Sequence, residues 1–344
     1  MLVAQLISRD TTLLLLFAAI LGLYIAGRIA IFALAPPDGS KPGWRAIAQC
    51  IPIFAAAIAA VVMRQPEVAV SIIFGTSVAC LSLALGATTI LSPLNPSPAN
   101  RRMWAFALPA ALVCLIAGFN GSLTWWHAVL LLALGAAILA VWLDPQMEGS
   151  STSDTPVAAT PSQPFNQAIV FVIVSILLAG GASVVMMHKA PAAAANARWL
   201  SPALMATFIL SPLIALPTFV TITTVGQQGH SGRALTALVG TVLLNLCLLL
   251  PLVIFLQHLM PASNGAEQPT HGFWIRLFTQ GQPLPFPVYV WRIDSVLLVI
   301  LGFLLVPVAM GRWLIGNATS LVLIFGYIVY LAADVFIVLR THIS

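Results

Sequence analysis

The chain has 344 residues, of which 60% are hydrophobic and only 7% are Asp, Glu, Lys or Arg. A soluble globular domain carries about a quarter charged residues, so this composition excludes a water-soluble fold and makes lipid the main solvent. The net charge of +5 is scattered over loops, which excludes nucleic acid as a partner. We expect an integral, multi-pass membrane protein of the inner or plasma membrane, with the lipid bilayer as its first partner.

Apolar runs long enough to cross a bilayer, about 20 residues each, recur along the chain. The first run is too long for the apolar core of a cleaved signal peptide. We place the spans at 11–35, 46–63, 67–92, 103–119, 123–143, 166–187, 199–225, 234–257, 286–310 and 317–339. The sequence therefore predicts an all-α polytopic membrane protein with ten transmembrane helices.

One stretch, residues 144–165, is rich in Ser, Thr and Pro and cannot bury a core. We interpret it as a flexible polar linker between a first five-helix membrane repeat, 1–143, and a second five-helix repeat, 166–344. With an odd number of spans per half, the second half enters the membrane from the opposite side. That is the inverted-repeat arrangement of secondary transporters. Lys and Arg are shared equally between the two sides, so the orientation stays open.

Several features of the first half recur 165 positions later in the second half. Pro52 corresponds to Pro217, and Gly75-Thr76 corresponds to Gly240-Thr241. The leucines that follow keep the same offset: Leu81, Leu83 and Leu85 recur as Leu246, Leu248 and Leu250. A shared register of this kind indicates an internal duplication.

At these residues the sequence resembles the cation/calcium exchanger superfamily, the sodium/calcium and related cation antiporters. Members carry a Gly-Thr-Ser-x-Pro-Glu-type motif on the second helix of each repeat and a Gly-Ser-Asn-x-x-x-Asn-type motif opening the third. Here Pro52 and Pro217 match the motif proline. The Gly-Ser-Asn positions hold Gly75-Thr76-Ser77 and Gly240-Thr241-Val242, and the later asparagine is Asn245. The resemblance implies two inverted five-helix repeats and secondary transport of a cation.

The glutamate that follows the proline in the family is replaced by Ile53 in the first half and by Thr218 in the second. Calcium needs six to eight oxygen ligands, commonly with carboxylates among them, and uncompensated charge is costly at membrane depth. We therefore expect an antiporter for a monovalent cation or a proton rather than calcium. The alternative is a non-transporting membrane scaffold or subunit that kept the exchanger fold and lost the ion site.

The candidate ion or substrate pathway consists of neutral polar side chains. Thr218 and Thr221 can share one helix face, as can Thr241 and Asn245. Against this, Ser and Thr in membrane helices usually bond back to their own backbone. The full set is Gln49, Thr76, Ser77, Thr218, Thr221, Thr241 and Asn245.

Two charged residues, Asp334 and Arg28, fall inside predicted spans and are candidate intramembrane charges. Asp334 could instead reach the interface near Arg340, and Arg28 could snorkel to headgroups. Asp294 lies near the start of the ninth span, where we expect an interfacial position. No catalytic nucleophile motif, phosphate-binding loop or metal-ligand spacing is present. We expect no enzymatic activity, cofactor or metal cluster, and protein partners stay open.

Overall fold

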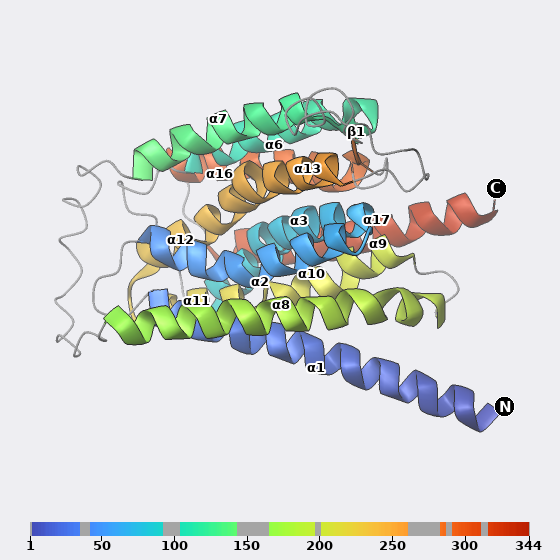
Figure 1. Cartoon of the computed structure of the whole chain (residues 1–344). Helices are drawn as coiled ribbons and strands as arrows, with labels where there is room; N and C mark the ends of the chain where they lie inside the picture. Colours follow the sequence, from blue (N-terminus) through green and yellow to red (C-terminus); the bar gives the residue numbers. More distant parts are fainter. Residues whose placement is uncertain are drawn as a thin grey trace, which may run out of the picture.

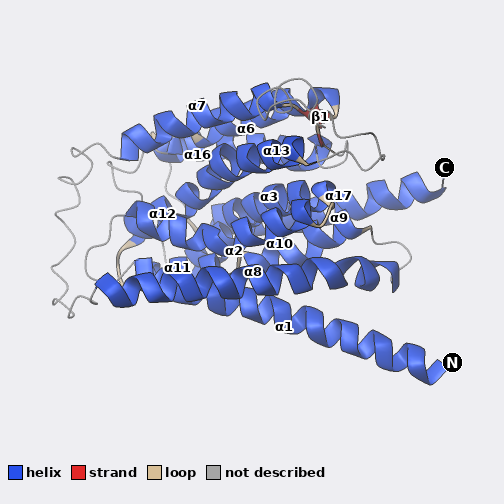
Figure 2. Cartoon of the chain, viewed as in Figure 1, coloured by secondary structure: helices blue, strands red, loops and turns tan. Residues whose placement is uncertain are grey.

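The computed structural model describes residues 2–34, 42–91, 104–142, 165–196, 201–260, 283–286, 291–310 and 316–343. Nearly all of these residues are helical (Figure 2). Seven of the helices are long and apolar enough to cross a membrane, and two shorter apolar helices accompany them. Of the expected linker 144–165, all but Phe165 lies outside the described residues.

The first half begins with one long helix, and its third span is a helix interrupted by a π-helical turn. The elements are α1 (Leu2–Leu34), α2 (Pro42–Val62), α3 (Pro66–Ala79), the π turn η1 (Cys80–Ala84), α4 (Leu85–Leu91), α6 (Ala107–Ala117), the 3-10 turn η3 (Gly118–Asn120), β1 (Ser122–Leu123) and α7 (Trp125–Trp142).

The second half contains three further π turns. Its elements are α8 (Phe165–Asn196), α9 (Pro202–Met205), η5 (Ala206–Leu210), α10 (Ser211–Ile214), α11 (Leu216–Gln227), α12 (Ser231–Leu244), η6 (Asn245–Leu249), α13 (Leu250–Leu259), β2 (Leu284–Pro285), η8 (Trp291–Ser295), α16 (Val296–Ala309) and α17 (Asn317–Ile343). The helix α8 continues beyond the predicted span 166–187 because the alanines before Asn196 are strong helix formers.

The helices form an elongated bundle in which most axes run in roughly the same direction (Figure 1). On one side α1 packs along α8, where a Cβ added to Gly22 would lie 3.1 Å from Ala182 Cβ. On the other side α6, α7 and α16 form an outer layer (Figure 1). Between these sides lies α3, all of whose residues from Val68 to Ala79 are buried. The polar groups of this stretch of α3 are therefore enclosed by the rest of the protein.

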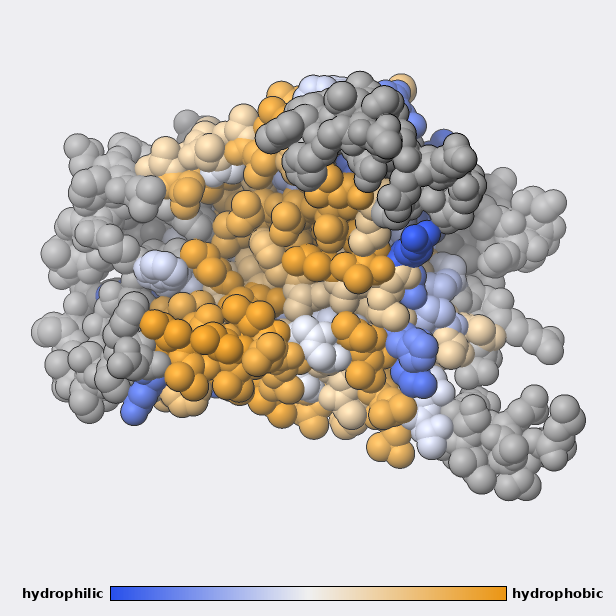
Figure 3. Space-filling view, in the orientation of Figure 1, coloured by the Kyte–Doolittle hydropathy of each residue, from blue (hydrophilic) through white to orange (hydrophobic). Residues whose placement is uncertain are grey.

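On the face shown in Figure 3, hydrophobic residues form a broad band across the bundle. Large apolar side chains such as Leu14 of α1, Leu177 of α8 and Phe325 of α17 are more than two-thirds exposed. In water such an area would drive association, whereas in a bilayer it faces acyl chains. The structure therefore agrees with an integral membrane protein.

Local structure repeats between the halves at the offset found in the sequence. The helix α12 begins and ends 165 residues after α3, and the π turn η6 begins and ends 165 residues after η1. The positive-φ residues Arg64 (φ 59°) and Gly229 (φ 83°) have the same separation. Each closes the preceding helix in a Schellman-type C-cap. In these caps Gln65 N–H donates to Ala60 O at 2.8 Å and His230 N–H to Val225 O at 3.2 Å.

Candidate functional site

The two motif prolines meet at one glycine of α1. A Cβ added to Gly27 would lie 2.9 Å from Pro217 Cβ and Cγ and 3.0 Å from Pro52 Cγ. Proline removes a backbone N–H and so interrupts helical hydrogen bonding. Pro52 lies inside α2, whereas the helix of the second half breaks at Ala215, and Pro217 follows in the first turn of α11. The interrupted segments of both halves therefore lie against the same position of α1.

A hydrogen bond joins the two halves where α2 packs against α12. The hydroxyl of Thr241 donates to Gln49 Oε1 at 2.8 Å, and Ala237 O lies at the same distance as an alternative acceptor. The thiol of Cys50 lies 3.7 Å from Thr241 O. All three side chains are buried. The structure thus brings together two predicted pathway residues, Gln49 and Thr241, that are 192 positions apart.

Further predicted pathway residues are buried with unused hydrogen-bonding capacity. Gln49 Nε2, Thr218 Oγ1 and both polar atoms of the Asn245 side chain have no hydrogen-bond partner in the described part of the chain. Gln49 is 1% exposed, and Thr218 and Asn245 are fully buried. Buried polar groups are normally paired because an unpaired one costs about 1–3 kcal/mol. Unpaired polar groups on helices that contain or follow a proline are typical of a ligand site in a transporter.

The other predicted hydroxyls bond within their own helices. Thr76 donates to Ile72 O at 2.6 Å, Ser77 to Ile73 O at 2.7 Å and Thr221 to Pro217 O at 2.7 Å. This is the ordinary behaviour of Ser and Thr in membrane helices. It also leaves the hydroxyl oxygens with free lone pairs, which are the part of the group that a cation would contact.

The residues at the two glutamate positions differ in chemistry. Ile53 is fully buried and belongs to the hydrophobic core, so its side chain offers no oxygen. Thr218 contributes one neutral hydroxyl. Glycine at position 75 permits close packing of the neighbouring helix, since a Cβ there would lie 2.9 Å from Ser211 Cβ of α10. Ser211 in turn donates to Ser71 O at 3.4 Å.

The two candidate intramembrane charges lie in different surroundings. Arg28 is exposed on α1, and its Nη1 donates to Thr221 Oγ1 at 3.4 Å. Asp334 is 2% exposed and lies close enough to Asp294 to interact electrostatically.

Asp294 itself is 1% exposed, so the expected interfacial position is corrected to one inside the protein. The sequence showed only that this carboxyl group stands at the edge of an apolar run, which does not by itself indicate burial. Packing of η8 against α3, α6 and α17 then decides its burial.

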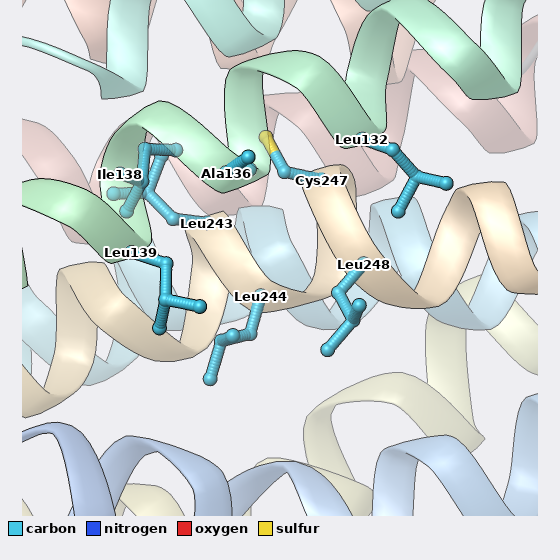
Figure 4. Close-up of a pocket in the computed structure, with 9 residues that line it drawn as sticks. Leu132, Ala136, Ile138, Leu139, Leu243, Leu244, Cys247 and Leu248 are labelled. Atoms are coloured by element: carbon cyan, nitrogen blue, oxygen red, sulfur yellow. The ribbon is translucent and has the colours of Figure 1, made fainter.

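A separate cavity of about 250 Å³ lies between α7 and the α12–η6 helix (Figure 4). Its lining is apolar: Leu132, Gly135, Ala136, Ile138, Leu139, Leu243, Leu244, Cys247 and Leu248. None of the predicted pathway residues lines it. The cavity therefore suits hydrocarbon and not an ion.

Comparisons with known proteins agree with the fold. A family model described as "Sodium/calcium exchanger protein" matches residues 45–143 and 167–336. A structure of the sodium-calcium exchanger NCX_Mj, soaked with zero Na⁺ and Ca²⁺, superposes with a TM-score of 0.61 at 15% identity, covering 94% of this chain and 98% of that one. The crystal structure of the H⁺/Ca²⁺ exchanger CAX superposes with a TM-score of 0.60 at 14% sequence identity. The match covers 98% of this chain and 94% of that one. No curated protein matches by sequence.

Proposed function

Since the chain belongs to the sodium/calcium exchanger family, we propose that it is a secondary transporter that exchanges a monovalent cation or a proton by alternating access. The family consists of cation antiporters and not enzymes. The observation that carries the choice of ion is the neutral, buried polar cluster around the Gln49–Thr241 hydrogen bond.

The proposed architecture is ten transmembrane helices in two inverted five-helix repeats, 1–143 and 166–344, joined by the linker 144–165. Three observations support it. The halves share one π turn, η1 and η6, and one Schellman cap at the same offset. The motif prolines of both halves meet at Gly27. Finally, α1 begins and α17 ends at the same end of the bundle (Figure 1), as an even number of crossings requires.

The proposed cation pathway contains Gln49, Thr76, Ser77, Thr218, Thr221, Thr241 and Asn245. The side chains of these residues are uncharged hydroxyls and amides. Ion dehydration in a medium of low dielectric rises with the square of the charge, so neutral oxygens compensate a monovalent ion far better than a divalent one. The carbonyl groups freed near Pro52 and Pro217 would add further oxygens.

A flux assay in proteoliposomes tests the proposal directly. The purified full-length protein is reconstituted, and uptake is followed under separate Na⁺, K⁺, H⁺ and Ca²⁺ gradients. We expect a monovalent cation or proton gradient to be dissipated and a calcium gradient to persist. The Thr218→Ala variant should slow the flux at least about tenfold, because one buried ligand oxygen is lost.

The matched control is Thr89→Ala, another buried threonine, whose hydroxyl bonds only Leu85 O of its own helix among the described residues. Its flux should equal that of the unaltered protein. If the folded protein shows no flux under any of the four gradients, the proposal is contradicted and the scaffold alternative is favoured. Calcium uptake would overturn the argument from Ile53 and Thr218.

A further inference from the structure

A second group of buried polar side chains lies outside the proposed pathway, between η8 and α17. Two of its members are acids, Asp294 and Asp334, which are 1% and 2% exposed. The others are hydroxyls: Tyr327 and Tyr330, each 4% exposed, and Ser295, fully buried. We call these five residues the acid–tyrosine cluster.

The two acids and the two tyrosines of the cluster lie close together. Asp294 interacts electrostatically with Asp334, and the Tyr330 hydroxyl approaches the Asp294 carboxyl. The Tyr327 and Tyr330 rings have their centroids 5.7 Å apart at 40°, and Tyr327 interacts with both acids. Two carboxyls and two phenols therefore share one buried space.

The polar atoms of the cluster are not satisfied by the described part of the protein. Both oxygens of Asp294, Oδ1 of Asp334, the hydroxyls of Tyr327 and Tyr330, and Ser295 Oγ have no hydrogen-bond partner there. These unpartnered hydroxyls, more than nine-tenths buried and next to the carboxyls, are an observation separate from the acids themselves. They indicate a ligand that hydroxyl and carboxyl oxygens can hold.

Positive charge around the cluster is scarce among the described residues. Among the side chains that the structure describes on η8 and α17, the charged or titratable neighbours are Tyr327, Tyr330 and Arg292, whose side chain is exposed. The helix α17 also carries Arg340 and His342, whose side chains lie outside the described part. The helices packed against it contribute Cys80 from η1, Cys114 from α6 and the exposed Glu67 from α3, whereas α4 and α16 contribute no titratable side chain. No described cation is thus buried against the two carboxyls.

Two carboxylates cannot both be ionised side by side in a dry site without a compensating cation, because desolvation and mutual repulsion act together. A proton held between them resolves the conflict, as in other carboxyl pairs. The hydroxyls of Tyr327 and Tyr330 can then donate to the remaining anionic oxygen.

We propose that Asp294 and Asp334 form the proton-binding site of this exchanger, with Tyr330, Tyr327 and Ser295 as hydrogen-bonding partners of the carboxyl pair. This inference rests on the proposed function and names the proton as one of the exchanged ions. The pair binds one proton in the closed bundle and releases it when the site becomes hydrated.

The cluster is connected to the crossing of the two halves. Tyr327 interacts electrostatically with Cys80 of η1, and Cys80 with Cys50 of α2. The thiol of Cys50 lies against Thr241 O, next to the Gln49–Thr241 bond. The acid–tyrosine cluster and the proposed cation pathway therefore approach one another at the π turn η1.

The depth of the cluster agrees with a site inside the bundle. A Cβ on Gly86 of α4 would meet Ser320 and Ile324 of α17, whereas Tyr327 lies near Cys80. The helices α4 and α17 thus run in opposite directions, and Asp334 falls level with the buried stretch of α3, Val68 to Ala79. The π turn η8 carries Asp294, and such turns are frequent at functional sites.

The experiment measures proton and cation movement in the same proteoliposomes, with a pH dye trapped inside and an imposed monovalent cation gradient. The full-length protein should move protons against the cation. Asp294→Asn and Asp334→Asn, which keep the shape of the side chain, should each reduce proton movement at least about tenfold. Glu67→Gln, a change at an exposed acid, should leave it unaltered.

Infrared difference spectra of the detergent-solubilised protein give a second readout that does not require transport. A carbonyl band of a protonated carboxyl should appear on acidification and disappear in both Asn variants. Tyr330→Phe should shift this band, because the proposed hydrogen bond from this hydroxyl to the pair can no longer form. The thermal unfolding temperature of each variant reports whether it is folded.

The outcomes separate this inference from the proposed function. Cation exchange without proton movement, or Asn variants that still couple protons, would overturn the inference and leave the pathway at Thr218 intact. A carboxyl band abolished by Ca²⁺ at constant pH would also overturn it, since the acids would then be a divalent cation site. If Thr218→Ala abolishes the flux of every ion but keeps the pH-dependent carboxyl band, the result agrees with both the proposed function and this inference.

Discussion

Pro52 of α2 and Pro217 of α11, at equivalent positions of the two halves, both pack against Gly27 of α1. The glycine has no side chain and so allows two rigid pyrrolidine rings to approach the α1 backbone. The contact joins the interrupted segments of both halves to a peripheral helix that also packs along α8. Movement of α1 would therefore be transmitted to both prolines together.

A methyl group at position 27 should disrupt this contact. In Gly27→Ala the new Cβ would be 2.9 Å from Pro217 and 3.0 Å from Pro52, and neither ring can turn aside. We expect overpacking to cost about 1–3 kcal/mol and transport to slow. Thermal unfolding in detergent and flux in proteoliposomes measure the two effects.

The control for that variant is Gly180→Ala on α8, where a Cβ would meet nothing within 4 Å. Alanine is the better helix former by about 1 kcal/mol, so this change should raise the unfolding temperature slightly. If Gly27→Ala left the unfolding temperature and the flux unchanged, Pro52 and Pro217 would not pack against α1 as closely as described.

The Gln49–Thr241 hydrogen bond should matter more than the size of either side chain. Thr241→Val keeps the shape and removes the donor, which leaves Gln49 Oε1 buried without its partner. We expect a loss of about 1–3 kcal/mol and a weaker apparent affinity for the transported cation. Thr241→Ser retains the hydroxyl, so it should keep most of the stability and most of the cation affinity. If the Val and Ser variants behave alike, this hydrogen bond has no role in either property.

Restoring carboxylates at the two motif positions should create an affinity for calcium. In the double variant Ile53→Glu with Thr218→Glu, Ca²⁺ would relieve the repulsion between two buried acids. Saturating Ca²⁺, at about 100 times its dissociation constant, should stabilise the variant by about 2.7 kcal/mol. The unaltered protein should show no such shift in unfolding temperature. A similar shift in both would mean that calcium binds elsewhere.

Arg28 should be dispensable for folding. Its bond to Thr221 is 3.4 Å long and its side chain is exposed, so we expect Arg28→Gln to change the free energy of unfolding by less than about 1 kcal/mol. If the guanidinium acts as a fixed charge beside the pathway, the same variant should alter the cation dependence of flux while Arg28→Lys should not. Loss of folding in Arg28→Gln would point instead to a structural role.

The sequence by itself determined the membrane location, because 60% hydrophobic and 7% charged residues leave no surface for water. It also determined the family, since the prolines and the Gly-Thr pairs keep their spacing along the chain. Spacing of this kind is a local property: one π turn and one C-cap recur at the same offset in both halves.

Only the tertiary structure decided which polar side chains are paired. Gln49 and Thr241 are 192 positions apart, and periodicity cannot say that two helices cross at those turns. It cannot say either that Asp294 and Asp334, at opposite ends of the last two helices in sequence, share one buried space. Burial depends on what packs against a residue from elsewhere in the chain, and the cost of burying a charge depends on every neighbour that it then meets.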